Sequence, residues 1–128
     1  MIAGIGMDLV DIERVELLMA DRGERATTKL FTEREAAYAM GRAHPARHFA
    51  ARFAAKEAAY KALAGNELAR GIGWREIEVL RDDTSGQPGL ALHGRAAERA
   101  AELGVTRVHL TLTHSHSTAA AVVILERD

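Results

Sequence analysis

The sequence predicts an α+β fold in which a largely antiparallel sheet is packed by one long helix and several short ones. Three observations predict it: alternating apolar residues near both ends of the chain, a long Ala-rich stretch with helical spacing in the middle, and two short apolar runs joined by a Gly-containing turn. The 128 residues are 48% hydrophobic, which is enough for a core without disulfides. We therefore expect a single domain over residues 1–128.

The first third of the chain is expected to hold a strand and two helices. Residues 2–10 alternate with the period of a strand. The next residues, 11–20, carry apolar side chains at helical spacing behind an Asp that suits the N-cap position. Thr32 followed by Glu35 is the capping-box pattern, so a second short helix is expected to begin there and to end at Gly41.

The longest helix is expected over residues 46–64. Pro45 suits its first turn, and Gly65 with Asn66 are residues that commonly end a helix. At about 100° per residue, the aromatic side chains of this helix share an apolar stripe that Lys and Arg side chains border.

The second half of the chain is expected to contain four strands and one helix. Apolar runs and turn residues predict a strand over 77–80, a turn over 86–89, its hairpin partner over 90–92, a helix over 94–103, and strands over 105–113 and 118–125. The expected order is thus strand, three helices, two strands, helix, two strands.

Composition excludes several kinds of protein. Lys and Arg number 17 against 18 Asp and Glu, so the net charge of -1 argues against a general nucleic-acid binder but permits a local basic patch. The chain has no Cys, which excludes disulfides, thiolate metal sites and Cys nucleophiles and fits a cytoplasmic protein. No run approaches the roughly 18 apolar residues of a membrane-spanning helix. We therefore expect neither nucleic acid nor membrane as a partner.

The first strand carries the first candidate site residue, Asp8. Strand periodicity places Gly4, Gly6 and Asp8 on one face, and two residues without a Cβ leave that face open beside a single carboxylate. Two interpretations follow. Either the glycines admit a ligand beside Asp8, or they make room for a packed helix while Asp8 caps the helix that follows.

The long helix carries the second group of candidates. Between residues 42 and 61 there are five Lys or Arg and one acid, Glu57. Glu57 and Lys61 form either an i,i+4 surface ion pair, with the neighbouring Arg and Lys stems lying over the edge of the core, or part of an anion site. In the second case Asp8 and Glu57 together bind a hard divalent cation such as Mg²⁺, and the basic side chains neutralise phosphates.

A third group follows the strand expected over 105–113. His114 and His116 share a face in extended backbone, and a His-x-His pair can bind Zn²⁺. A third ligand is not evident, since Cys and an H-E-x-x-H motif are both absent. The alternatives are a polar strand end and a hydrogen-bonding His at a phosphate site.

Taken together and in this order, the three groups resemble the holo-acyl-carrier-protein synthases, the small bacterial type of 4′-phosphopantetheinyl transferase. Four segments carry the resemblance, which spans the whole chain: residues 4–10 for the G-x-D strand motif, 31–35 for F-T-x-x-E, 51–62 for W/F-A-x-K-E-A-x-x-K, and 111–115 for the late S-x-S/T-H segment. The long-helix segment is the most specific of them. His116 has no counterpart in that pattern, and its role stays open.

The resemblance implies a Mg²⁺-dependent transfer of 4′-phosphopantetheine from CoA to a serine of an apo acyl carrier protein, as in fatty-acid biosynthesis, with release of adenosine 3′,5′-bisphosphate. It implies metal binding by Asp8 and Glu57 and contact of Lys61 with the CoA phosphates, and these three are the expected catalytic residues. Beside Lys61, the expected CoA-binding residues are Arg52, Thr113 and His114. The acceptor of the serine proton stays open between Glu57 and a metal-bound water.

The resemblance also implies two kinds of protein contact. Members of the family form homotrimers with active sites at the subunit interfaces. The acidic carrier protein docks on the region of the first helix, where Arg14 matches a docking arginine and Arg22 and Arg25 follow. The alternative for these arginines is ordinary solubilising charge, balanced by neighbouring acids.

Two functions of other classes compete with the transferase. One is a non-catalytic module that binds CoA or a nucleotide, and the other is a structural oligomerisation domain whose charged helix faces water. Metal dependence separates the enzyme from the binding module, and CoA binding separates the binding module from the structural domain.

Overall fold

The elements follow one another much as the sequence predicts. The computed structural model describes residues 1–64 and 69–128. In chain order the elements are β1 (Ile2–Asp11), α1 (Ile12–Arg22), α2 (Glu24–Leu30), α3 (Glu33–Met40), α4 (Pro45–Leu63), the 3₁₀ turn η2 (Trp74–Glu76), β2 (Ile77–Arg81), β3 (Pro88–Leu92), α5 (Gly94–Glu102), β4 (Val105–His114) and β5 (Thr118–Arg127).

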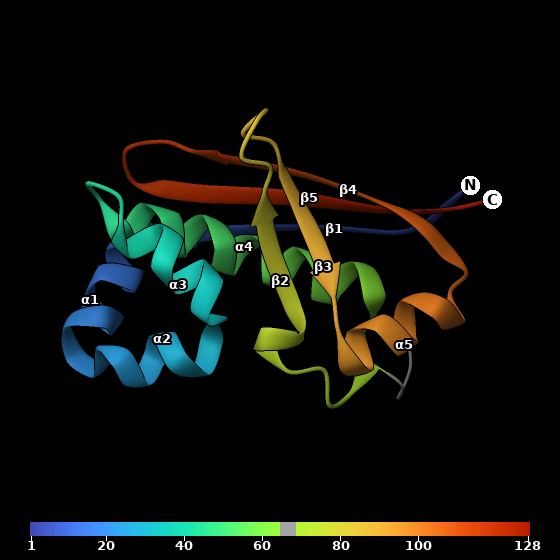
Figure 1. The fold of residues 1–128 in the computed structure, drawn as a ribbon, viewed down its shortest axis with the longest axis horizontal. Helices are drawn as coiled ribbons and strands as arrows, with labels where there is room; N and C mark the ends of the chain where they lie inside the picture. The colour runs from blue at the N-terminus through green and yellow to red at the C-terminus, as the bar shows by residue number, and fades with distance from the viewer. Residues whose placement is uncertain (65–68) are drawn as a thin grey trace.

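The strands form two antiparallel sheets. Three of them, in the order β1-β5-β4, make a long sheet that runs the length of the molecule, and β2 pairs with β3 in a separate hairpin (Figure 1). Helix α4 packs along one face of the long sheet, against β1 and β5. Helices α1, α2 and α3 gather at one end, and the two termini lie together at the other (Figure 1). The α+β prediction is confirmed, with two sheets in place of one.

Two local predictions about helix starts are confirmed. The side chain of Asp11 accepts a hydrogen bond from the amide of Glu13 at 3.1 Å, as an N-cap does. At the start of α3, the hydroxyl of Thr32 accepts from the amide of Glu35, and the Glu35 carboxylate accepts in return from the amide of Thr32. Both caps satisfy amides that a helix start leaves without a partner.

Other boundaries differ from the expectation. Helix α2 was not predicted, because its seven residues bury only Ala26 and so carry no apolar period. The turn η2 was not predicted either, and Pro88, which was expected in a turn, begins β3. The expected helix stop at Gly65 and Asn66 lies outside the described residues.

The two glycines of β1 let α4 approach the sheet closely. A Cβ on Gly4 would overlap the carbonyl oxygen of Ala62, and a Cβ on Gly6 would overlap that of Ala58. The side chains on the facing surface of α4 are small as well, and Ala54 and Ala58 are fully buried there. The packing interpretation of the glycines is therefore confirmed, while the cap of α1 is Asp11 and not Asp8.

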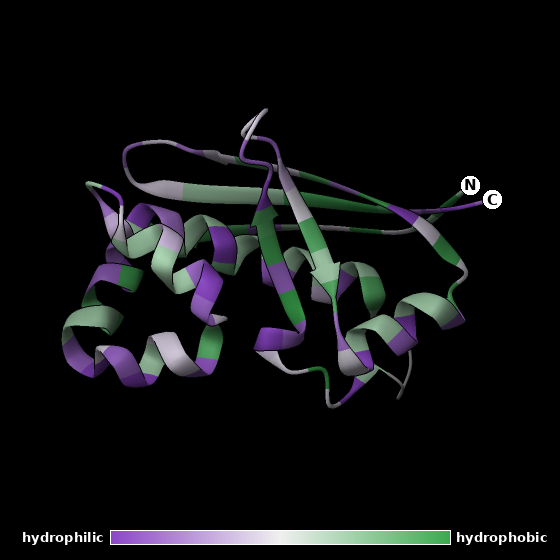
Figure 2. Cartoon of the chain, viewed as in Figure 1, coloured by the Kyte–Doolittle hydropathy of each residue, from purple (hydrophilic) through white to green (hydrophobic). Residues whose placement is uncertain are grey.

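The core has two parts joined by α4. One lies between α4, the long sheet, the hairpin and α5, and apolar residues run along β5 within it (Figure 2). The other lies between α1, α3 and the first half of α4, where the rings of Phe31 and Phe49 are 4.8 Å apart. No helix among the described residues is long and apolar enough to cross a membrane.

The face of the long sheet opposite α4 is open. On β1 it presents Ile5, Met7 and Leu9, whose exposed fractions are 63%, 56% and 62%. Their register partners on β5 are Ile124, Val122 and Ala120, which are partly exposed. The outer face of the sheet is therefore apolar along two adjacent strands.

Candidate active site

Asp8 and Lys61 meet where α4 crosses β1. Asp8 lies on the strand face that the two glycines open to α4, and its side chain is 18% exposed. The ammonium of Lys61 lies 3.0 Å from Asp8 Oδ1 and donates to the carbonyl oxygen of Met7 at 3.1 Å. The ion pair of Lys61 thus joins α4 to β1.

Glu57 lies one helical turn before Lys61 and lines the same cavity as Asp8. Burial is the main cause that raises the pKa of Glu57, the negative charge of Asp8 adds to it, and the positive charge of Lys61 opposes it. The structure therefore brings Asp8 of β1 together with Glu57 and Lys61 of α4, which are far from it in the chain.

These two carboxylates fit a magnesium ion. Among the residues that the structure describes, no group of three or more His, Cys, Asp or Glu surrounds a point suited to a metal. Mg²⁺ needs only one or two protein carboxylates, because waters and substrate phosphates supply its other ligands. A pair of carboxylates beside an open cavity is such a donor set, and a Zn²⁺ site at His114 and His116 has no support in the described residues.

The cavity beside the carboxylates is large and mostly apolar. Its volume is about 810 Å³, and β1, α1, α2 and α4 enclose it with side chains that include Leu18, Met19, Leu30 and Phe53. Arg14 lines it as well and is exposed. A basic side chain thus lines the same cavity as the two carboxylates.

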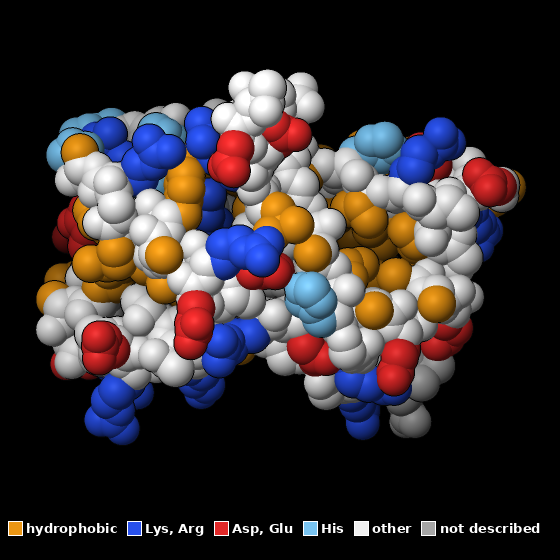
Figure 3. Space-filling view, in the orientation of Figure 1, with side chains coloured by type: hydrophobic (Ala, Val, Ile, Leu, Met, Phe, Trp, Pro, Cys, Tyr) orange, Lys and Arg blue, Asp and Glu red, His pale blue; other side chains and the backbone are white. Residues whose placement is uncertain are grey.

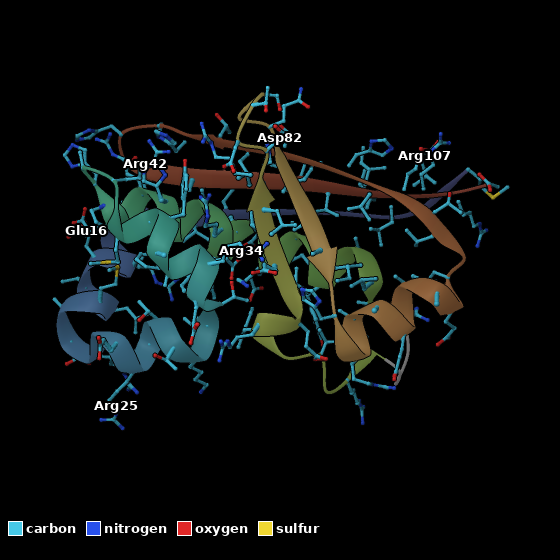
Figure 4. All side chains as sticks on the ribbon, in the orientation of Figure 1. Glu16, Arg25, Arg34, Arg42, Asp82 and Arg107 are labelled. Carbon is cyan, nitrogen blue, oxygen red and sulfur yellow. The ribbon has the colours of Figure 1, made fainter. Side chains whose placement is uncertain are left out.

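The other two candidate docking arginines lie outside this cavity lining. Arg22 is exposed at the end of α1, with its Nε 3.7 Å from Asp21 Oδ2. Arg25 is exposed on α2 and points away from the body of the molecule (Figure 4). Of the three, Arg14 is the one that shares a cavity with Asp8 and Glu57.

Arg52 belongs to a second, cationic cluster beside the first half of α4. Its guanidinium carbon lies 4.1 Å from the centre of the Tyr38 ring, and those of Arg42 and Arg81 lie at 4.5 Å and 5.6 Å. The ring of His48 meets Tyr38 edge-on at 5.6 Å. Lys, Arg and His side chains gather at this end of the molecule (Figure 3). Tyr38 thus lies among three guanidinium groups.

The surroundings of Arg52 and His48 are unfavourable for additional positive charge. Arg52 is 5% exposed, and its Nε has no hydrogen-bond partner among the described residues. Burial chiefly lowers the pKa of His48, and the charges of Arg52, Arg42, His114 and Arg47 lower it further. Positive charge from several elements is therefore concentrated at this cluster.

His114 and Thr113 lie at the end of β4 but on opposite faces. His114 is exposed and near enough to His48 to affect its pKa, so it borders the cationic cluster. Thr113 is the adjacent strand residue and pairs with Ala120, so it lies on the open face of the sheet. The expected CoA-binding residues are thus distributed over three places: beside Asp8, in the cationic cluster, and on the open face.

The surface interpretation of the long helix is wrong for two of its basic residues. Arg52 is 5% exposed and Lys56 is completely buried, so their stems do not lie over the core edge with the charge in water. Tyr38 and Arg81 were not among the residues predicted from the sequence. These come from α3 and β2, and no local pattern shows that they meet Arg52.

Comparisons with known proteins agree with this geometry. The family model of the 4′-phosphopantetheinyl transferase superfamily matches residues 4–123. The holo-[acyl-carrier-protein] synthase of Anaeromyxobacter sp. strain K is 48% identical over 129 residues, covering 98% of this chain and 97% of its own.

Solved structures show the same fold. The crystal structure of holo-[acyl-carrier-protein] synthase from Neisseria meningitidis matches with a TM-score of 0.86 at 29% identity, covering 99% of this chain and 100% of its own. That of the Bacillus anthracis holo-(acyl-carrier-protein) synthase, in complex with CoA (3′,5′-ADP), matches with a TM-score of 0.78 at 32% identity, covering 100% and 99%. The chain therefore belongs to the 4′-phosphopantetheinyl transferase superfamily and, within it, to the holo-[acyl-carrier-protein] synthases.

Proposed function

We propose that this protein transfers 4′-phosphopantetheine from CoA to a serine hydroxyl of an apo acyl carrier protein and releases adenosine 3′,5′-bisphosphate. The observation that carries the proposal is the meeting of Asp8, Glu57 and Lys61 beside a cavity of about 810 Å³. The chain supplies two carboxylates and a cation at one point, which is what the displacement at a pyrophosphate requires.

Asp8 and Glu57 would bind Mg²⁺, which when bound neutralises pyrophosphate charge and makes the phosphorus a better electrophile. Lys61 is half exposed, so its ammonium is free to turn from Asp8 towards a phosphate. As a compact point charge, it stabilises the anionic leaving group. The serine proton would pass either to the carboxylate of Glu57 or to a water held by the metal.

The cationic cluster supports the binding of CoA. Arg52, Arg42 and Arg81 around Tyr38, bordered by His114, offer positive charge and an aromatic face to a phosphorylated nucleoside. Arg52 is almost fully buried, so its guanidinium acts on such an anion from beneath the surface. The structure of the Bacillus anthracis protein with CoA (3′,5′-ADP) supports this class of ligand.

In a homotrimer, the expected CoA-binding residues of neighbouring subunits come together in one site. Thr113 lies on the open face of the sheet, away from the groups near Asp8. The same face carries Ile5, Met7 and Leu9, three large apolar side chains that water covers in the isolated chain. We place neighbouring copies of the chain on this face, with each CoA contacting two subunits.

The carrier protein docks at α1. Arg14 stands beside the apolar cavity that leads to Asp8 and Glu57, and an acidic carrier protein presents negative charge to it. Arg22 and Arg25 are exposed beyond this cavity and would add further contacts with the carrier protein. We place the reaction in the cytoplasm and in fatty-acid biosynthesis, with neither nucleic acid nor membrane as a partner.

The direct test is intact-mass spectrometry of an apo acyl carrier protein incubated with this protein and CoA, with Mg²⁺ and with EDTA. We expect a gain of one phosphopantetheine mass with Mg²⁺ and none with EDTA. A folded sample that binds CoA but modifies none of several apo carrier proteins would instead be a non-catalytic CoA-binding module.

A further inference from the structure

Lys56 is a buried ammonium that has no part in the proposed transfer. It directly precedes Glu57 on α4, but its side chain faces the interior and is completely buried. Its Nζ lies 2.7 Å from Glu35 Oε1 and donates to the carbonyl oxygens of Trp74 at 2.8 Å and Ile77 at 2.5 Å. A lysine ammonium has three donor hydrogens, so these three acceptors satisfy it.

Glu35 extends this contact to two further elements. Its carboxylate accepts from the amide of Thr32 in the capping box of α3 and from the amide of Val79 on β2, at 2.9 Å and 2.8 Å. Glu35 is only 1% exposed. The pair of Lys56 and Glu35 therefore ties α3, η2 and β2 to α4.

The segment that Lys56 holds is one wall of a second cavity. This cavity has a volume of about 260 Å³, with Ile72, Gly73 and Trp74 on one side and Glu57 and Tyr60 of α4 on the other. Glu57 lines this cavity and the larger one. The position of the Trp74 wall therefore sets the space on one side of a candidate catalytic carboxylate.

Stability alone is a poor reason for a buried lysine here. Replacing a buried ion pair with apolar side chains of similar volume is often neutral or stabilising, because two charges lose their hydration on folding. What Lys56 supplies specifically is a donor for two carbonyl oxygens of an irregular segment. Without it, that segment would turn its carbonyl groups towards water.

We infer that Lys56 is a positioning residue: by binding the carbonyl groups of Trp74 and Ile77, it fixes the wall beside the candidate catalytic carboxylate of Glu57. The kinetic part of this inference rests on the proposed function. The structural part does not, because Trp74 is the only tryptophan of the chain and reports on the wall by its fluorescence.

The first test is the double variant Lys56→Met with Glu35→Gln, which removes the ammonium without leaving a buried carboxylate unpaired. We expect Trp74 emission to move to longer wavelength and acrylamide to quench it more readily. The kcat of transfer should fall about tenfold, since small misplacements near a reacting centre have effects of up to about 100-fold. The KM for the carrier protein should stay within about twofold of the unmutated value.

Leu125→Ala is the matched control. Leu125 is 1% exposed in the core between the sheet and α4, so its truncation lowers stability without touching the wall. We expect a lower Tm with the Trp74 spectrum and the kcat of transfer unchanged. The inference is overturned if Trp74 emission in the double variant matches the unmutated protein, or if the control lowers the kcat equally.

A chemical rescue keeps the test decisive if the double variant does not fold. The chain has no Cys, so Lys56→Cys introduces a unique thiol that can be alkylated in the unfolded protein before refolding. Aminoethylation restores an ammonium at the same distance along the side chain, and propylation gives a neutral side chain of similar size. We expect the aminoethyl protein to recover the Trp74 spectrum and the propyl protein not to. Equal behaviour of the two proteins would overturn the inference.

The two proposals fail in different ways. If the protein transfers no phosphopantetheine but Trp74 responds to the ammonium, the proposed function is wrong and the anchoring by Lys56 holds. If transfer occurs and Trp74 is indifferent to the ammonium, the function holds and the positioning role is wrong.

Discussion

Lys61 on α4 binds Asp8 on β1, with 3.0 Å between the ammonium nitrogen and the carboxylate oxygen, although 53 positions separate them in the chain. The pair places the candidate phosphate-binding cation against a candidate metal ligand. A metal ion at Asp8 would neutralise the charge that now holds Lys61. Ligand binding is therefore expected to release Lys61 towards a phosphate.

The carboxylates of Asp8 and Glu57 are each predicted to be essential for transfer. Glu57→Gln and Asp8→Asn keep the size of each side chain but remove its charge, so each should lower the rate of transfer by about 100-fold or more. Circular dichroism should show that both variants keep the fold. Near-normal transfer by either variant at saturating Mg²⁺, measured by intact mass, would show that its carboxylate is not a metal ligand.

Gly6→Ala is predicted to destabilise the protein by about 1–3 kcal/mol, as overpacking of a close contact does. The new Cβ would overlap the carbonyl oxygen of Ala58 and push α4 from the sheet. Gly89→Ala on β3 is the matched control, because a Cβ there meets no atom within 4 Å. Urea unfolding of the two variants measures the difference, and equal free energies of unfolding would contradict the close-packing argument.

Arg14→Glu is predicted to weaken the binding of the carrier protein without changing the binding of CoA. Charges at the rim of an interface mainly set the association rate and its dependence on salt. We expect a higher KM for the carrier protein, a weaker effect of added salt, and an unchanged KM for CoA. Steady-state kinetics with each substrate varied in turn measures this, and equal changes in both KM values would argue against docking at Arg14.

The open sheet face is predicted to hold the subunits together. Met7→Lys places a charge among apolar side chains of that face, where Met7 is 56% exposed in the single chain. We expect sedimentation velocity to show a trimer for the unmutated protein and smaller species for the variant, together with a loss of transfer. A monomeric unmutated protein with full activity would refute the interface site.

His48 is predicted to make stability fall on acidification. Its pKa is lowered in the folded state from the reference value of 6.5, chiefly by burial and then by Arg52 and Arg42. Between the folded pKa and 6.5 the unfolded chain binds more protons, so the free energy of unfolding decreases as pH falls through that window. Urea unfolding midpoints between pH 7.5 and 5 should fall less steeply for His48→Gln. An identical slope in the variant would show that His48 is not responsible.

Local chemistry explains which predictions from the sequence were confirmed. The N-cap at Asp11 and the capping box of Thr32 and Glu35 use hydrogen bonds between residues two or three positions apart, so a short window contains both partners. The alternation in β1 likewise showed that Gly4, Gly6 and Asp8 share a face. The short helix α2 was missed because seven residues that bury one side chain leave no period to detect.

Local sequence patterns were enough to predict the fold class, two helix caps and the segments that identify the family. The packing of distant elements was needed to show that Lys56 is buried while Lys61 reaches Asp8, that Arg52 lies against Tyr38, and that Thr113 is on the open face of the sheet. The cause of this difference is distance along the chain. A side chain's burial and partners depend on elements that pack against it from far away in sequence, and residue spacing within one helix or strand carries no record of them.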